Sequence, residues 1–253
     1  VVFLVAFAPY LRWRGDTLAR FVGQLKLPLI VAVVLAAFAF ALFSAPWAAV
    51  LGVLAGVWVI AAMLNYVRVH RADPQRQSRG FNRATIGMLL AHAGIGVFVI
   101  GVFVTEATSI EKDVRLVPGE SIEVRGYRFV FEKLEHREGP NFAADRGVIG
   151  VFKGDRRVET MHPEKRQYRG GQVMTEADLD PGLSRDLYVA MGEPVGDNNA
   201  WAIRIYHKPF IRWIWLGALF MMFGGFVAAL DPKLRAARAA ARRLSSDSAG
   251  ATA

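Results

Sequence analysis

The 253-residue chain is 53% hydrophobic and its mean hydropathy is +0.28, a composition that indicates a membrane protein. It contains no cysteine, which excludes disulfides, cysteine-ligated zinc and a CxxCH haem-attachment site within this chain. The formal net charge of +9 is uneven: residues 105–208 carry 16 Lys and Arg against 18 Asp and Glu, and the remainder carries 15 against 4. The excess positive charge therefore lies beside the apolar segments, where it indicates membrane topology and not nucleic-acid binding.

Apolar segments follow one another along the first hundred residues. The chain begins at Val1 inside such a segment, so we expect a partial helix there and a chain that is a fragment or a naturally split subunit. About 20 apolar helical residues span the core of a bilayer. This length predicts further spans within residues 1–104, at about 27–43, 47–67 and 86–104, and a final span at about 209–230.

Basic residues occupy the segments between these spans. Lys and Arg outnumber acidic residues at 12–26, at 68–83 and in the tail at 231–253. The positive-inside rule places all three on the cytoplasmic side, and strict alternation then places residues 105–208 on the opposite side. The end of the tail is rich in Ser, Ala and Gly, so we expect the tail to be partly disordered.

Residues 105–208 differ in pattern from the rest of the chain. Short runs of alternating polar and apolar residues, broken by Gly, Pro and Asp, predict β-strands. The sequence "KGDR" at 153–156 has the form of a tight hairpin turn. We expect about six to eight strands in a small barrel or sandwich, with longer loops between Gly139 and Arg146 and between Lys165 and Ser184. The predicted fold class is a polytopic α-helical membrane protein with an inserted β-rich domain.

One histidine, His92, lies inside the apolar run "GMLLAHAGIGVFVIGVF" at 87–103. Polar residues at membrane depth are costly and often functional. A neutral imidazole is a good axial ligand for haem iron, and Gly96, one turn away, would leave room for a porphyrin edge. Alternatively, His92 forms a hydrogen bond to a neighbouring helix or faces a water-filled cavity. A stripe of small residues beside it would let another helix or a flat macrocycle approach closely: Ala84, Gly87, Ala91, Gly94 and Gly101.

The other polar candidates are weaker. His70 is expected to be solvated in a basic loop, and the remaining histidines, His136, His162 and His207, are too far apart for a local metal motif. The acidic segment at 174–194 lacks the spacing of a calcium-binding loop and is interpreted as a loop entering a strand. In "HPEKRQY" at 162–168, Lys165 and Arg166 could bind an anion or haem propionates, but a solvated turn is the preferred interpretation.

Several long motifs occur in one order along the chain: "RGFNRATIGMLLAHAGIGVFVIGV", "GPNFAADRGVIGVF", "HPEKRQY", "MTEADLDPGLSRDLYVAMGEP" and "WAIRIYHKPFIRWIWLGALFMMFGG". Together they closely resemble the C-terminal part of the CcmF/NrfE family of cytochrome c-type biogenesis proteins, the haem lyases. The resemblance implies a multi-pass protein of the bacterial inner membrane, with residues 105–208 in the periplasm. It also implies transfer of haem from the chaperone CcmE to the CxxCH motif of apocytochrome c, and a haem b held between membrane helices.

The resemblance extends to one site residue. In this family one axial ligand of haem b is the histidine of an "LAH.G" motif, which matches His92. The second ligand and the tryptophan-rich segment that handles incoming haem belong to the N-terminal portion, so the fragment alone is not expected to be a complete lyase. The implied partners are that N-terminal portion, CcmE, apocytochrome c, its delivery subunits CcmH and CcmI, and membrane lipid. No residue of the β-rich domain can be assigned a catalytic role.

Two other functions remain open at this point. One is a transporter of haem or another solute with His92 in a proton path, although the chain shows no internal repeat and no paired carboxylates in its apolar segments. The other is a non-catalytic assembly subunit in which His92 only packs.

Overall fold

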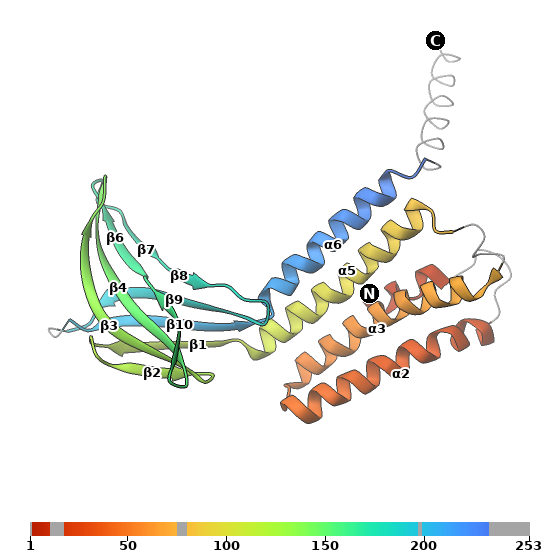
Figure 1. The fold of residues 1–253 in the computed structure, drawn as a ribbon, viewed down its shortest axis with the longest axis horizontal. Coiled ribbons are helices and arrows are strands. Elements are labelled where there is room, and N and C mark those ends of the chain that lie inside the picture. The colour runs from red at the N-terminus through yellow and green to blue at the C-terminus, as the bar shows by residue number, and fades with distance from the viewer. Residues whose placement is uncertain (1, 11–17, 75–79, 197–198, 233–253) are drawn as a thin grey trace, which may run out of the picture. The chain divides into compact units, whose positions relative to one another are not determined.

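The computed structural model describes residues 2–10, 18–74, 80–196 and 199–232, and the basic tail beyond 232 lies outside them. The chain divides into two compact units. The described residues of one unit, which comprises 1–107 and 213–253, are mainly helical, and those of the other, 108–212, are mainly β-strands (Figure 1).

Long apolar helices make up the first unit. Its elements are α1 (Val2–Val5), η1 (Ala8–Tyr10), α2 (Leu18–Phe43), α3 (Trp47–Ala72), α5 (Arg83–Thr108) and α6 (Ile211–Ala229). Four of them contain a segment long and apolar enough to cross a membrane: Val22–Leu42, Trp47–Ala72, Arg83–Thr108 and Ile211–Ala229. Helices α3 and α5 continue past the expected ends at 67 and 104, because helical hydrogen bonding persists into the polar residues that flank each apolar run.

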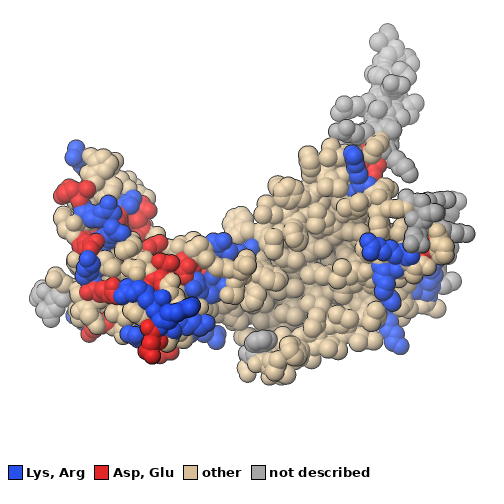
Figure 2. Space-filling view, in the orientation of Figure 1, with Lys and Arg blue, Asp and Glu red and all other residues tan. Residues whose placement is uncertain are grey.

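The surface of the helical unit is mostly apolar. In Figure 2 it is largely tan, and the blue atoms of Lys and Arg gather near one end of it. Large side chains such as Phe40 (61% exposed), Leu64 (67%) and Phe226 (62%) point outward from three different helices. A soluble protein rarely exposes so much contiguous apolar surface, so these helices are suited to a lipid environment.

The second unit is a sandwich of two antiparallel sheets. One sheet has the order β1-β10-β9-β8 and the other the order β2-β3-β4-β6-β7, with β5 paired to β4. Strand β4 is long enough to pair with β6 over its first half and with β5 over its second half. The strands are β1 (Ile110–Leu116), β2 (Ser121–Val124), β3 (Tyr127–Glu138), β4 (Phe142–Lys153), β5 (Arg156–Met161), β6 (Glu164–Tyr168), β7 (Val173–Glu176), β8 (Asp178–Asp180), β9 (Arg185–Pro194) and β10 (Trp201–Pro209).

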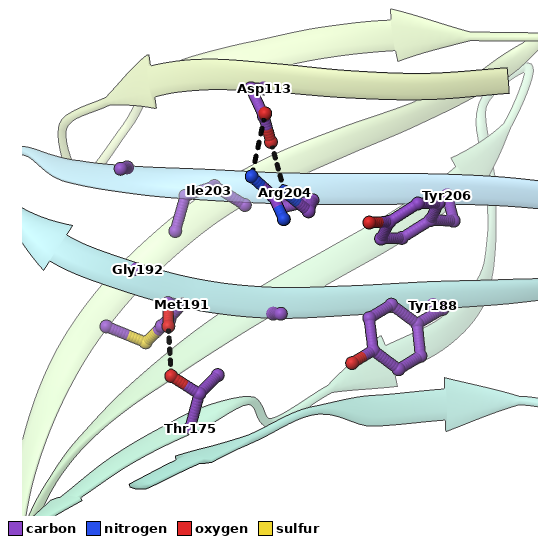
Figure 3. Close-up of a pocket in the computed structure, with 10 residues that line it drawn as sticks. Asp113, Thr175, Tyr188, Met191, Gly192, Ile203, Arg204 and Tyr206 are labelled. Atoms are coloured by element: carbon purple, nitrogen blue, oxygen red, sulfur yellow. Dashed lines mark hydrogen bonds and ion pairs between the residues drawn. The ribbon is translucent and has the colours of Figure 1, made fainter. Parts of the chain in front are cut away.

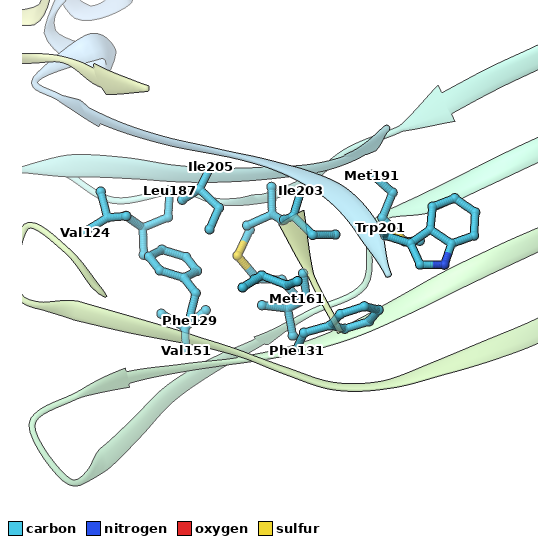
Figure 4. Close-up of a cluster of buried hydrophobic side chains, with 13 residues drawn as sticks. Val124, Phe129, Phe131, Val151, Met161, Leu187, Met191, Trp201, Ile203 and Ile205 are labelled. Atoms are coloured by element: carbon cyan, nitrogen blue, oxygen red, sulfur yellow. The ribbon is translucent and has the colours of Figure 1, made fainter. Parts of the chain in front are cut away.

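A single apolar core fills the space between the two sheets (Figure 4). Alternate residues of each strand point into it, as the period of two predicts. The fully buried members include Phe129 and Phe131 of β3, Leu187 of β9 and Ile203 and Ile205 of β10. The expected sandwich is therefore confirmed, and so is the "KGDR" hairpin, since Lys153 pairs with Arg156 across Gly154 at a φ of +60°.

The expected loops within the sandwich are wrong over most of their length, and only residues 139–141, 169–172, 177 and 181–184 of them lie outside strands. Residues 142–153 form β4, and the segment from 164 to 180 forms the three strands β6, β7 and β8. The described residues therefore contain ten strands and not six to eight. The side chains of β6 and β7 are mostly polar, so they give no apolar alternation, yet their backbones pair with β4 and with each other. Backbone hydrogen bonding stabilises such edge strands without an apolar face.

Candidate functional site

His92 lies in the middle of α5, one of the four membrane-spanning candidates, and its side chain is partly buried. Its ring nitrogen Nδ1 is 2.9 Å from the carbonyl oxygen of Met88, one turn earlier in the same helix. A carbonyl oxygen can accept a hydrogen bond but cannot donate one, so Nδ1 is the donor. In a neutral imidazole with its proton on Nδ1, the lone pair is on Nε2. The hydrogen bond that the structure gives to this ring is the one at Nδ1. The ring is therefore oriented by its own helix, with a nitrogen suited to bind a metal.

The small-residue stripe of α5 packs against α6. A Cβ added at Gly87 would lie 2.3 Å from the carbonyl oxygen of Gly224, and one added at Gly94 would lie 2.7 Å from that of Gly217. Real side chains do not approach a backbone so closely, so glycine is required on both helices. Of the two partners expected for the stripe, another helix or a flat macrocycle, the structure shows a helix, α6.

A second glycine face of α5 packs against α3. A Cβ at Gly96 would lie 2.6 Å from Cγ1 of Ile60 and 2.7 Å from the carbonyl oxygen of Gly56. The room that we expected at Gly96 for a porphyrin edge is therefore filled by α3. In a helix of 3.6 residues per turn, His92 lies about 40° around the axis from Gly96, on the flank of the face that meets α3.

The other histidines do not form a metal site. No group of three or more His, Cys, Asp or Glu residues with metal-binding geometry occurs within the described residues. His136 pairs with Asp145 at 3.2 Å on the exposed surface of the sandwich, and His207 is a buried strand residue. The expectation for His70 is wrong: it belongs to α3, its ring nitrogens are buried, and it stacks on Phe81 with ring centroids 4.2 Å apart.

The charged residues of the sandwich that could have formed a binding site lie apart from one another, because neighbouring residues of a strand point to opposite faces of the sheet. Lys165 and Arg166 are neighbours in β6, so their side chains lie on opposite faces of the sheet and cannot both bind one anion. Lys165 pairs with Glu193 at 2.6 Å, whereas Arg166 pairs with Glu164 at 2.8 Å. In the acidic segment, the carboxylates are engaged by protein partners: Asp178 accepts from the His162 N–H, Asp180 pairs with Arg185 and Asp186 pairs with Arg212.

An open pocket of about 480 Å³ lies on the outer face of the β1-β10-β9-β8 sheet (Figure 3). Tyr188 and Tyr206 stand side by side on neighbouring strands with ring centroids 5.3 Å apart. Arg204 binds Asp113 through two hydrogen bonds, of 2.6 and 3.0 Å. Sequence reasoning missed this pocket. The signal lies in the outward positions of β9 and β10, where the small residues Ala190, Gly192 and Ala202 lie on the same face as the two tyrosines. The charged lining groups are paired, so the pocket offers shape and aromatic contact more than acid-base chemistry.

Known proteins resemble this chain over both units. Residues 107–209 match the family described as the CcmF C-terminal beta-sandwich. The cytochrome c-type biogenesis protein CcmF of Pseudomonas fluorescens is 40% identical over 236 residues, which cover 92% of this chain and 36% of that protein. The CcmF of Escherichia coli strain K12 is 35% identical over 238 residues, with the same two shares of 92% and 36%. The chain belongs to the CcmF family.

The match places the chain in the C-terminal portion of that family. A solved structure titled cytochrome c haem lyase CcmF superposes with a TM-score of 0.72 at 16% identity, over 90% of this chain and 38% of that chain. At that identity the likeness shows a shared fold, in which three membrane-spanning candidates of this chain precede the β-sandwich and the fourth follows it. The chain spans 36% of the length of the CcmF relatives named above. It is therefore a CcmF-family multi-pass membrane chain that corresponds to about a third of a whole CcmF.

Proposed function

We propose that this chain is the C-terminal portion of the haem lyase of cytochrome c maturation, and that His92 supplies one axial ligand of a haem b. The observation that supports this most is the state of the His92 ring. It lies in a membrane-spanning helix, Nδ1 donates to the Met88 carbonyl 2.9 Å away, and Nε2 keeps its lone pair. Histidine ligands of metals commonly have the second nitrogen fixed by such a hydrogen bond.

The residues around His92 serve to hold α5 in place. Gly87 and Gly94 bring α5 onto α6, and Gly96 brings it onto α3, so the helix is fixed on two sides. A rigid helix presents a ligand with little loss of entropy on binding. When bound, the haem b would supply an iron that can change its oxidation state, and His92 would be one of the residues that hold it. The second ligand is proposed to come from the N-terminal portion of the protein.

The remaining parts of this proposal concern partners and topology. We propose that the haem that the whole protein transfers comes from the chaperone CcmE, and that the acceptor is the CxxCH motif of apocytochrome c, delivered by CcmH and CcmI. The proposal also places the protein in the bacterial inner membrane with the sandwich in the periplasm. The names of the relatives support the role in cytochrome c-type biogenesis, and the basic residues of the segments at 12–26 and 68–83 support the topology.

The test uses the assembled membrane complex that contains this chain together with the N-terminal portion. His92→Gly should abolish the absorption of haem b and cytochrome c maturation, and imidazole added to the purified variant should restore the absorption. His136→Ala, on the surface of the sandwich, is the matched control and should keep both. Unchanged haem b absorption in His92→Gly would rule out the ligand role.

The same variants separate the other two functions. If His92→Gly keeps the haem but stops proton-coupled uptake into vesicles, the transporter interpretation is favoured. If it only lowers the amount of assembled complex, and imidazole restores nothing, His92 has a packing role in an assembly subunit.

A further inference from the structure

A row of large side chains crosses the outer face of the β1-β10-β9-β8 sheet. Leu179 of β8 lies opposite Tyr188 of β9, and Tyr188 lies opposite Tyr206 of β10. Residues directly opposite each other in antiparallel strands share one face of the sheet, so the three side chains form a ridge across the strands. Leu179 is 50% exposed, and the two tyrosine rings have centroids 5.3 Å apart (Figure 3). This ridge faces away from the core of the sandwich.

The pocket of about 480 Å³ is a trough beside this ridge. Thr175 of β7 lies at one end of the trough and Asp113 of β1 at the other, with β9 and β10 between them (Figure 3). The trough therefore runs across the strands, along the ridge. Small outward residues make up its floor: Ala190, Gly192 and Ala202.

The charges at the Asp113 end of the trough balance one another. Arg204 binds Asp113 through hydrogen bonds of 2.6 and 3.0 Å and lies 3.3 Å from Glu111. Arg115 is the next outward residue of β1 and lies opposite Ala202. Two cations therefore stand against two carboxylates at this end.

The charges at the other end are balanced as well. Lys165 pairs with Glu193 at 2.6 Å and donates to the hydroxyl of Thr175 at 3.3 Å. A charged ligand would lose its hydration in the trough and would meet no unbalanced charge of the opposite sign. Charge complementarity therefore selects a neutral ligand.

The hydrogen-bonding groups of the trough are side chains. Strand β10, which crosses the middle of the trough, pairs with β1 on one side and β9 on the other, so a peptide lying over it cannot extend the sheet there. The Tyr206 hydroxyl donates to Glu111 at 2.9 Å, whereas the contact that the structure gives to the Tyr188 side chain is the one between the two rings. The Tyr188 hydroxyl is therefore suited to donate to a carbonyl oxygen of a ligand.

A proline-rich peptide meets these conditions. Proline has no backbone N–H that needs an acceptor, and the polyproline II helix leaves its carbonyl oxygens unpaired. Neighbouring strands lie about 4.8 Å apart, so the path from β9 over β10 to β1 is about 10 Å long. One turn of polyproline II, three residues at about 3.1 Å each, covers almost the same distance. Aromatic side chains on one wall are also what such peptides bind.

We propose that this trough binds a neutral, proline-rich segment of a partner protein in the polyproline II conformation. Its prolyl rings pack against Tyr188 and Tyr206, and the Tyr188 hydroxyl donates to one of its carbonyl oxygens. The buried area is small, so the contact is weak and reversible, as in transient encounters. The proposal concerns the sandwich alone and does not depend on the haem ligand at His92.

The test measures the binding of a fluorescent hexaproline peptide to the full chain in phospholipid nanodiscs, by fluorescence anisotropy with empty nanodiscs as the blank. Hexaproline should bind the native chain more tightly than a Gly-Ser peptide of the same length and label. Tyr188→Ala should weaken this binding at least about ten-fold, as loss of a tyrosine at the centre of an interface does. Tyr168→Ala is the matched control, because Tyr168 belongs to the other sheet and its ring packs against Phe142. It should keep the native affinity.

Two further variants separate the contacts. Tyr188→Phe keeps the ring and loses the hydroxyl, so it should weaken binding only a few-fold. Ala190→Leu keeps both tyrosines and fills the floor of the trough, so it should weaken binding as much as Tyr188→Ala. Thermal unfolding of each variant confirms that the sandwich is folded.

Three outcomes would overturn the proposal. The first is that hexaproline does not bind the native chain, or binds it no better than the Gly-Ser peptide does. The second is that folded Tyr188→Ala and Ala190→Leu both keep the native affinity, because the peptide would then bind elsewhere. The third is tighter binding of a hexaglutamate peptide at the same site, which would show that the trough selects anions.

Discussion

Asp231, the second residue after α6, accepts a hydrogen bond from the backbone N–H of Ala84 in the first turn of α5, at 2.9 Å. Its side chain is 2% exposed. The first N–H groups of a helix have no partner within the helix, and a carboxylate that accepts from one of them is also stabilised by the helix dipole. The contact therefore joins the end of α6 to the beginning of the helix that carries His92.

Removing this carboxylate should loosen the α5 and α6 pair. Asp231→Ala is expected to lower the free energy of unfolding by about 1 kcal/mol, the usual value of a lost helix cap. Asp231→Asn keeps an acceptor oxygen and should lose less. Thermal unfolding of the chain in nanodiscs measures both. Equal melting temperatures for Asp231→Ala and the native chain would show that the contact does not stabilise the pair.

Two adjacent glycines of α6 should respond very differently to the same substitution. A Cβ at Gly224 would lie 2.5 Å from the backbone nitrogen of Ala91, whereas one at Gly225 would meet nothing within 4 Å. Gly224→Ala should therefore push α6 away from α5 and cost about 1–3 kcal/mol, as overpacking does. Gly225→Ala should be neutral or slightly stabilising. Thermal unfolding of the two variants under one condition checks this, and a similar loss in both would contradict the packing described.

The helices show which parts of this arrangement a sequence can predict. Length and hydropathy indicated the four spans, and the small residues of α5 indicated a close neighbour. The sequence did not indicate which helix packs against each glycine. Gly94 meets α6 and Gly96 meets α3. These two residues differ by two positions in the sequence, and the choice depends on tertiary packing that no local pattern records.

Glu164 in the sandwich is a buried carboxylate, with its side chain 7% exposed. Arg166 donates to it at 2.8 Å and Arg137 at 3.1 Å, and Arg146 lies 3.8 Å away. Glu164→Ala should leave several cations without their shared partner and cost about 3 kcal/mol, as breaking a buried ion pair does. Glu176→Ala is the control, because Glu176 is 41% exposed and lies 3.5 Å from Arg166. Denaturant unfolding should show a small effect for the control, and equal losses would contradict this account.

Glu164 also shows why the segment that contains it was assigned to a loop. "HPEKRQY" has no apolar face, so nothing in it indicates a strand. Its strand β6 is defined by backbone pairing with β4 on one side and β7 on the other. Its buried position depends on arginines from other strands, among them Arg137, which lies 27 residues earlier in the chain. Long-range pairing of this kind is decided by the whole sheet, whereas the apolar β9 and β10 could be predicted from alternation alone.

His207 should make the sandwich sensitive to acid. The side chain is 9% exposed, and burial lowers its pKa, with Arg125 and Arg185 lowering it further. The fold therefore favours neutral His207, and its stability is complete above about pH 6.5 and falls as the unfolded chain gains a proton below that pH. His207→Leu should reduce this fall. His136 has the opposite effect on stability at acid pH, because Asp145 raises its pKa and protonation therefore favours the folded state. His136→Ala should therefore make the loss of stability at acid pH steeper. Hydrogen exchange of β9 and β10 amides at about pH 5 and about pH 7.5 distinguishes the two variants, and identical pH dependence in both would refute the assignment.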